Sequence, residues 1–178
     1  MLKKLIPACT ALIITLSVVT ASASPALERE ITSDLKQFDG QVGVFAKNLK
    51  TGKTIKYNQD TVFPAASTSK LIVALATYKF LYPKAPPYKQ NEYDQDIDMM
   101  IKVSDNNTFA ALLNEFDATK KDGFDKVERD LRLRKTEIHD EQAFKKYSYH
   151  SVTTPYEMSK VLESIYREKY IDKKMCGD

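Results

Sequence analysis

Cysteine, histidine and tryptophan are the scarcest residue types of this 178-residue chain, which has two cysteines, two histidines and no tryptophan. Cys9 lies in an N-terminal segment that we expect to be removed, so Cys176 is the only cysteine of the predicted mature chain. An exported domain without an internal disulfide draws its stability from a hydrophobic core. The 5 glycines and 7 prolines are too few for a collagenous or low-complexity chain, and 43% hydrophobic with 29% charged residues is typical of one globular domain.

The chain also lacks a strong excess of charge of one sign. Its 27 basic and 24 acidic residues give a formal net charge of +3, which falls to +1 without Lys3 and Lys4. The remaining lysine pairs are bracketed by acidic residues, so no basic stripe of the kind that follows phosphates is present, and we expect no nucleic-acid partner. His139 and His150 have no partner at metal-ligand spacing on a secure element, so we expect neither a metal nor another cofactor.

The N-terminal segment has the features of a secretory signal peptide. A basic start at Lys3 and Lys4 precedes a short apolar stretch, residues 5–19, and a small-x-small cleavage site that ends at Ala23. The apolar stretch is shorter than the roughly 20 residues of a membrane-spanning helix. We therefore predict a signal peptide over residues 1–23, a folded domain over residues 24–178, no membrane span after cleavage, and a monomer located in the periplasm or cell wall.

Periodicity predicts the first elements of this domain. Apolar residues recur at helical spacing over residues 26–38, which predicts an amphipathic helix. The β-branched residues of segment 41–49 and of segment 54–57 predict a β-hairpin, and Gly52 suits a left-handed position in its turn.

The second half of the domain is predicted to be mostly helical. Residues 71–81 are apolar on every side, as in a helix buried in the middle of a domain, and a polar connection is expected to follow as far as Met99. Residues 109–116 show a second helical pattern, with a loop expected at residues 120–123, and residues 131–151 read as a long surface loop. In the last helix, Thr154 is the predicted N-cap, Pro155 the first helical residue and Glu157 the capping-box glutamate.

Two short motifs carry chemistry. Ser67 and Lys70 form an S-x-x-K motif at the start of the buried helix, where a lysine one turn after a serine projects from the same face and can take its proton. The helix N-terminus at Ser67 would also supply a backbone N–H and a positive dipole end to an oxyanion. Ser104 and Asn106 belong to a downstream S-D-N triplet, in which the serine can relay a proton to a leaving nitrogen and the asparagine can hold an amide carbonyl. The structural alternative is that Ser67 and Ser104 only cap helices.

Two further matches to such motifs are not predicted to be functional. Ser33 and Lys36 also fit S-x-x-K, but they lie on the exposed side of the first predicted helix. Lys50, Thr51 and Gly52 spell K-T-G, but this triplet precedes Ser67 and falls in the predicted hairpin turn.

The joint occurrence and order of S-x-x-K and S-D-N make the chain resemble the class A β-lactamase-like serine hydrolases, which include penicillin-binding proteins. The resemblance runs from the first helix to the V-T-T-P-Y-E-M segment at residues 152–158. It implies an α/β fold, with an antiparallel sheet, flanking helices and a helical lobe. In this family Ser67 would be the acylated nucleophile, Lys70 its base or proton shuttle, Ser104 the proton relay and Asn106 a substrate contact.

The same resemblance marks what the chain lacks. The family carries K-T-G on a strand well after S-D-N, whereas this chain stops at Asp178, so we expect a product that is incomplete at its C-terminus. Deacylation in class A enzymes depends on a glutamate of the loop before the last predicted helix. Glu141 is the candidate here and Glu137 the alternative, although a solvated loop charge is the default for either residue on a protein surface.

We therefore predict a serine hydrolase that opens β-lactam amides through an acyl-serine intermediate. One alternative is a D-alanyl-D-alanine peptidase or penicillin-binding protein that acts on cell-wall peptides. The other is an inactive or truncated binder, which the missing downstream motif favours and the intact S-x-x-K and S-D-N motifs oppose.

Overall fold

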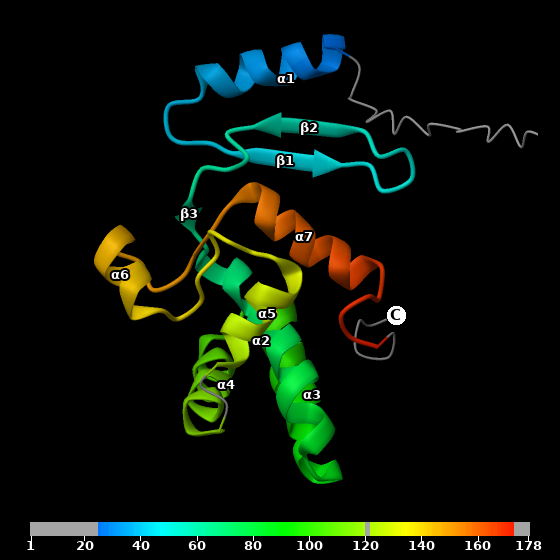
Figure 1. The fold of residues 1–178 in the computed structure, drawn as a ribbon, viewed down its shortest axis with the longest axis vertical. Helices are drawn as coiled ribbons and strands as arrows, with labels where there is room; N and C mark the ends of the chain where they lie inside the picture. The colour runs from blue at the N-terminus through cyan, green and yellow to red at the C-terminus, as the bar shows by residue number, and fades with distance from the viewer. Residues whose placement is uncertain (1–24, 120–121, 173–178) are drawn as a thin grey trace, which may run out of the picture.

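A computed structural model describes residues 25–119 and 122–172. The predicted signal peptide and Cys176 lie outside these residues. Two structural units follow one another along the long axis of the molecule (Figure 1). At one end a small sheet is sandwiched between helices, and at the other a lobe is built from helices alone, which confirms the predicted fold class.

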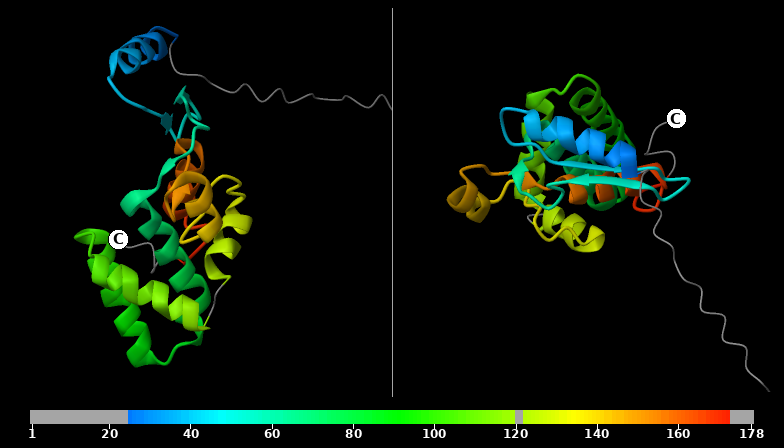
Figure 2. Two further views of the ribbon diagram at one scale, coloured as in Figure 1. Left: turned by 90° about the vertical axis from the view of Figure 1, so that its left-hand side faces the viewer. Right: turned by 90° about the horizontal axis from the view of Figure 1, so that it is seen from above.

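The sheet end has three layers. Strands β1 (Val44–Lys47) and β2 (Thr54–Tyr57) pair antiparallel, with Val44 opposite Tyr57. Helix α1 (Pro25–Gln37) lies on one side of this hairpin and helix α7 (Pro155–Tyr166) on the other (Figures 1 and 2). The predicted first helix, hairpin and last helix are confirmed.

Close packing holds α7 against the hairpin. The rings of Phe45 and Tyr156 meet edge to face with centroids 5.1 Å apart, and Lys47 forms a 2.7 Å ion pair with Glu163. Gly43 lies just before β1, where a β-carbon would come within 2.6 Å of the Phe63 ring. Only a residue without a side chain allows the chain to pass so closely at this point.

The hairpin turn contains the upstream K-T-G triplet and has the predicted conformation. The side-chain oxygen of Asn48 accepts hydrogen bonds from the backbone N–H groups of Lys50 and Thr51, at 3.0 and 2.9 Å. Gly52 has a φ of 74°, the left-handed region that glycine enters without steric cost. The triplet is therefore a turn on the protein surface.

Helix α2 (Ser69–Ala76) forms the centre of the helical lobe. It follows a 3₁₀ turn (Ala66–Thr68) and continues as a π-helical turn (Thr77–Leu81). The helix therefore begins two residues before the apolar run from which it was predicted, and its pitch changes over the last five residues of that run. Residues 72–76 are all buried. Helices α3 (Pro87–Lys102), α4 (Asn106–Thr119) and α5 (Gly123–Leu131) surround α2 and complete the core.

The predicted polar connection before Met99 is wrong, because α3 occupies it. This helix is mostly polar, and only Tyr93, Ile97 and Met100 turn their side chains into the core. Their spacing of four and three residues is helical, but the stripe is too narrow to stand out among the charges. Helix α5 has no counterpart among the predicted elements.

The long loop predicted over residues 131–151 is only partly irregular. Helix α6 (Glu141–Tyr147) interrupts it, with Asp140 as an N-cap that accepts a 2.6 Å hydrogen bond from the Ala143 N–H. The two ends of the loop are joined by an isolated antiparallel bridge between Glu137 and Val152. We call residues 133–152 the α5–α7 loop.

The α5–α7 loop is also tied to the segment that precedes α2. Strand β4 (Val152–Thr153) pairs antiparallel with β3 (Phe63–Pro64), and the Ala65 N–H donates to the Ser151 carbonyl at 2.9 Å. Within the part of the chain that the structure describes, no helix has the length and hydrophobicity to cross a membrane.

Candidate active site

The two residues of the S-x-x-K motif differ in their exposure to solvent. Ser67 lies in the turn and is exposed, whereas Lys70 lies in the first turn of α2 with only 3% of its surface accessible. Ser104 lies in the short connection between α3 and α4, and Asn106 is the first residue of α4; both are exposed. The structure brings these four predicted residues together.

A continuous line of hydrogen bonds connects them. The Lys70 ammonium group donates to the Ser104 hydroxyl at 2.9 Å, and the Ser104 hydroxyl donates to the Ser67 hydroxyl at 3.0 Å. No direct Lys70–Ser67 hydrogen bond is present among the described residues. Lys70 therefore reaches Ser67 through Ser104, across a sequence separation of more than 30 residues.

All three ammonium hydrogens of Lys70 have acceptors. Besides the Ser104 hydroxyl, the group donates to the Ser104 carbonyl at 2.6 Å and to the Asn106 side-chain oxygen at 2.8 Å. The nitrogen also lies 5.6 Å from the centroid of the Phe109 ring, within cation–π range. A buried charge is tolerated only when it is fully hydrogen-bonded, and this arrangement meets that condition.

The backbone takes unusual conformations on both sides of this line. Ala66, which precedes Ser67, has a φ of 46°, and Ser104 has a φ of 56°. Left-handed conformations cost a residue with a side chain roughly 1–2 kcal/mol, and such strain is concentrated at functional sites. At Ser104 the conformation turns both its carbonyl and its hydroxyl toward Lys70.

The middle residue of the S-D-N triplet has a structural task. The Asp105 carboxylate accepts a 2.8 Å hydrogen bond from the Thr108 N–H, as an N-cap of α4 does. This bond holds the pKa of Asp105 below its ordinary value. The cap fixes the start of α4 and with it the position of Asn106.

Glu141, the candidate deacylation base, is not joined to this group by any hydrogen bond or ion pair of the described residues. Its side chain is 77% exposed at the start of α6 and lies 3.5 Å from the His150 ring. His139 approaches Asp117 of α4 at 3.9 Å, so both histidines have the carboxylate neighbours that their sequence spacing did not indicate. Glu137 is half-buried in the α5–α7 loop, and burial raises the pKa of its carboxyl.

Glu157 has a role that its place in the sequence did not indicate. Its backbone N–H donates to the Thr154 hydroxyl at 3.1 Å, as expected for the N-cap of α7, but its carboxylate does not complete the capping box. The carboxylate instead accepts hydrogen bonds from the Arg134 N–H at 2.7 Å, the Lys135 N–H at 3.0 Å and the Thr136 hydroxyl at 2.7 Å. It therefore fixes the first residues of the α5–α7 loop.

The second S-x-x-K match lies elsewhere. Ser33 and Lys36 are exposed on α1, as predicted. They serve below as matched controls for Ser67 and Lys70.

Solved structures with this fold are distant in sequence. The structure of PBP-A is 17% identical, with a TM-score of 0.67 over 85% of this chain and 65% of that chain. The TLA-3 extended-spectrum β-lactamase is 18% identical, with a TM-score of 0.70 over 86% and 66%. A β-lactamase from Sphaerobacter thermophilus DSM 20745 is 15% identical, with a TM-score of 0.64 over 86% and 67%. The chain thus spans about two thirds of the length of these proteins.

Comparison with curated proteins gives no match. The family model for the Beta-lactamase enzyme family matches residues 26–82 and 81–178, which together include nearly all of the predicted mature chain. The match covers both motifs and both structural units. The chain therefore belongs to the Beta-lactamase enzyme family.

Proposed function

We propose that the chain acts as a serine hydrolase on β-lactam amides, with Ser67 as the acylated nucleophile. The observation that carries this proposal is the hydrogen-bonded line from Lys70 through Ser104 to Ser67. A serine attacks an amide only when its proton has somewhere to go, and this line provides a path to a buried amine. Family membership and the shared fold support the same assignment.

The reaction requires the direction of the hydrogen bonds between Lys70, Ser104 and Ser67 to reverse. In the structure Lys70 donates three hydrogen bonds, one for each hydrogen of an ammonium group. Once it has lost one proton, its lone pair can accept from Ser104, whose hydroxyl can then accept from Ser67. The Ser67 Oγ–carbonyl bond forms, the Ser67 proton passes through Ser104 to Lys70, and the amide C–N bond breaks as Ser104 returns a proton to the leaving nitrogen.

Asn106 is placed to bind the acyl side of the substrate. Its side-chain oxygen is committed to Lys70 at 2.8 Å, which leaves its amide hydrogens to donate to a substrate carbonyl. Because Ser67, Ser104 and Asn106 are all exposed, a substrate can approach the line from solvent.

A second candidate is a penicillin-binding protein with a long-lived acyl-enzyme. The observation in its favour is that Glu141 faces His150 and that no carboxylate of the described residues hydrogen-bonds to Ser67 or Ser104. One related structure is a mutant of PBP-A described as an acyl-enzyme complex with penicillin-G, 16% identical with a TM-score of 0.68 over 88% of this chain and 67% of that chain. Without a base to activate water, an acyl-serine persists.

The intact mass of the purified protein before and after benzylpenicillin tests both candidates. We expect one penicilloyl addition on the wild type and on Ser33→Ala, and none on Ser67→Ala. Persistence of the adduct for hours supports the penicillin-binding candidate, whereas its loss within minutes with turnover of the antibiotic supports the hydrolase. Labelling that survives in Ser67→Ala, or no adduct and no loss of antibiotic with the wild type, contradicts the proposal.

We also propose that the protein is exported and acts outside the cytoplasm. The basic, apolar and small-x-small pattern of residues 1–23 supports this, as does a β-lactam or cell-wall peptide substrate. N-terminal sequencing of the protein recovered from an extracytoplasmic fraction should begin near Ser24. Recovery of the full-length chain from the cytoplasm alone would contradict it.

A further inference from the structure

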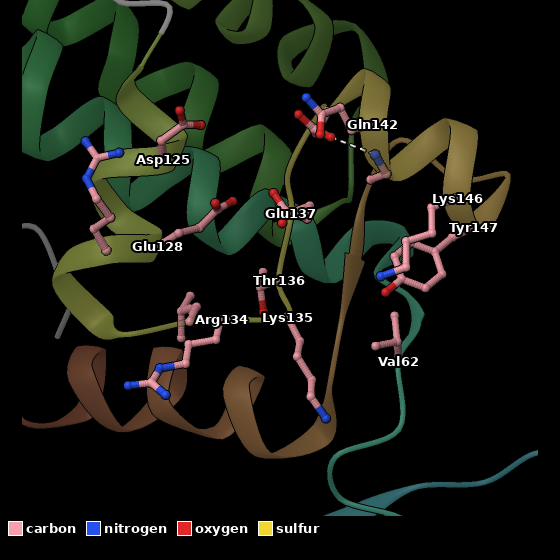
Figure 3. A pocket seen from close by; sticks show the side chains of 14 residues that line it. Val62, Asp125, Glu128, Arg134, Lys135, Thr136, Glu137, Gln142, Lys146 and Tyr147 are labelled. Atoms are coloured by element: carbon pink, nitrogen blue, oxygen red, sulfur yellow. Dashed lines mark hydrogen bonds between the residues drawn. The ribbon is translucent and has the colours of Figure 1, made fainter.

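A second cavity lies between α5 and the α5–α7 loop, and neither Ser67 nor Lys70 lines it. It has a volume of about 750 Å³, within the usual range for sites that bind small organic molecules. Its walls come from α5, the first residues of the loop, α6 and Val62, and charged side chains dominate them (Figure 3).

The most unusual wall residue is Glu128 of α5. Its side chain is over nine-tenths buried, with 8% of the residue surface accessible, and its Oε1 atom has no hydrogen-bond partner among the described residues. Figure 3 shows the carboxyl group directed across the cavity toward Glu137, with Asp125 nearby on the same helix. A buried acceptor without a donor costs about 1–3 kcal/mol, so such an atom is rare unless it has a task.

The other carboxylates of the cavity make this position more unfavourable. Glu137, Asp125 and Asp140 each repel a negative charge on Glu128. Burial, reinforced by this repulsion, raises the pKa of Glu128 to about 8, and burial together with Asp140 and Asp125 raises the pKa of Glu137. Lys146 partly offsets the rise at Glu137, whereas the groups that act on Glu128 are three carboxylates and the backbone N–H of Ile138.

Three basic side chains of the cavity are engaged elsewhere or point away from Glu128. The Lys135 ammonium group donates to the Asp60 carbonyl at 2.8 Å, and the Lys146 nitrogen lies over the Tyr147 ring at 4.7 Å from its centroid. Figure 3 shows the Arg134 guanidinium pointing away from Glu128. These groups line the cavity, but none of them forms an ion pair with Glu128 within the described part of the chain.

From these contacts we infer that the cavity binds a small organic ligand through a primary ammonium group, which donates to Glu128 and Glu137. An ammonium ion donates hydrogen bonds to oxygen atoms about 2.8 Å away in several directions, whereas a metal ion needs its oxygen ligands at about 2.0–2.6 Å. Among the described residues, no three acidic, histidine or cysteine side chains lie close enough together for a metal. A planar guanidinium pairs best with one carboxylate, and here the acceptors come from two different elements.

Binding would be coupled to proton release. Around pH 7 the Glu128 carboxyl carries its proton, and an ammonium ion beside it favours the ionised form, so the proton leaves to the buffer. The charged groups that line the cavity with Glu128 are Asp125 and Arg129 from α5, Glu137, Arg134 and Lys135 from the start of the loop, and Asp140 and Lys146 from the α6 end. Affinity should rise about eightfold between pH 6.5 and pH 7.5, since the ionised fraction of a group with a pKa of about 8 rises by that factor over this interval.

Calorimetry on the whole purified protein tests this inference with 1,5-diaminopentane as the probe. The uncharged 1,5-pentanediol has the same length and serves as the ligand control. At pH 8.5 we expect the diol and the Glu128→Gln variant each to bind at least tenfold more weakly than the diamine binds the wild type. Asp98→Asn on α3 removes the same charge from an exposed ion pair with Lys102 and should bind like the wild type.

Glu128→Gln is expected to fold, because it replaces a carboxyl group that is mainly neutral at pH 7 with a neutral amide of the same shape. Proton release, measured as the dependence of the binding heat on buffer ionisation, should vanish in this variant. Equal binding by wild type and Glu128→Gln, an equal loss in Asp98→Asn, or binding of agmatine but not of the diamine would each overturn the inference. Because no step of the test involves Ser67, its result is independent of the proposed acylation.

Discussion

The Glu157 carboxylate should stabilise the fold far more than any other acidic side chain of α7. It is 6% exposed and accepts hydrogen bonds from Arg134, Lys135 and Thr136. A hydrogen bond to a charged group contributes about 1.5–3 kcal/mol. Glu157→Gln keeps one acceptor oxygen but turns an NH2 group toward donors, so we expect a loss of about 2–4 kcal/mol in the free energy of unfolding.

Thermal and urea denaturation at pH 7 measure this loss. For a domain of this length, each kcal/mol lowers Tm by about 2–4 °C, so Glu157→Gln should melt roughly 5–15 °C below the wild type. Glu163→Gln on the same helix is the matched control. Its carboxylate forms surface ion pairs with Lys47 and Arg167, which are usually worth about 0–1 kcal/mol. Equal destabilisation by the two variants would refute the assigned role of Glu157.

A double-mutant cycle separates the hydrogen bond from general damage to the loop. Thr136→Val removes the hydroxyl that donates to Glu157 at 2.7 Å and keeps the shape of the side chain. If the two groups act together, the double variant should be more stable than the sum of the single losses predicts, by about 0.5–3 kcal/mol. Strict additivity would show that the two side chains stabilise the fold separately.

Three further predictions concern the active site, the hairpin and the second cavity. Lys70→Met should slow acylation by benzylpenicillin about 100-fold or more, whereas Lys36→Met should leave the rate unchanged. Equal acylation rates of the two variants, measured by rapid quenching and intact-mass spectrometry, would exclude Lys70 as the base. Gly43→Ala should lower stability by about 1–3 kcal/mol in urea unfolding, because its new methyl group overlaps the Phe63 ring, and an unchanged midpoint would contradict this packing. Glu128 keeps its proton up to a pKa of about 8 when folded but loses it near 4.5 when unfolded, so stability should fall by about 1.4 kcal/mol per pH unit between these values. In Glu128→Gln the corresponding part of this pH dependence should disappear, and an identical slope in both proteins would contradict the buried position.

The sequence predicted best those features whose physical cause lies within a few residues. The turn at Gly52 and the N-cap at Thr154 depend only on their neighbours, and both have the predicted form. The narrow apolar stripe of α3 did not stand out, because most of its surface faces solvent and only three side chains enter the core.

Long-range contacts account for what the sequence pattern could not show. Ser67 and Lys70 are linked by local spacing, but their connection runs through Ser104, which the fold brings in from a different helix junction. From its neighbours alone Glu157 looks like a capping-box residue. The groups that donate to its carboxylate lie more than 20 positions upstream, where the local pattern does not reveal them. Glu128 looks like an ordinary surface charge on an amphipathic helix until the α5–α7 loop covers it.

The bridge between Glu137 and Val152 closes the α5–α7 loop at a neck, and it constrains the sequence of the loop differently at the neck and beyond it. Glu137 bonds to Val152 in both directions, at 3.1 and 2.9 Å, so the stretch between them begins and ends at almost the same place. Once the ends of a loop are fixed, doubling its length costs only about 0.6 kcal/mol. The number of residues between the neck positions can therefore change at little entropic cost, and those that line the second cavity determine the shape of its wall. The neck itself cannot vary in this way, since the Ser151 carbonyl beside it accepts the hydrogen bond that holds Ala65, two residues before Ser67.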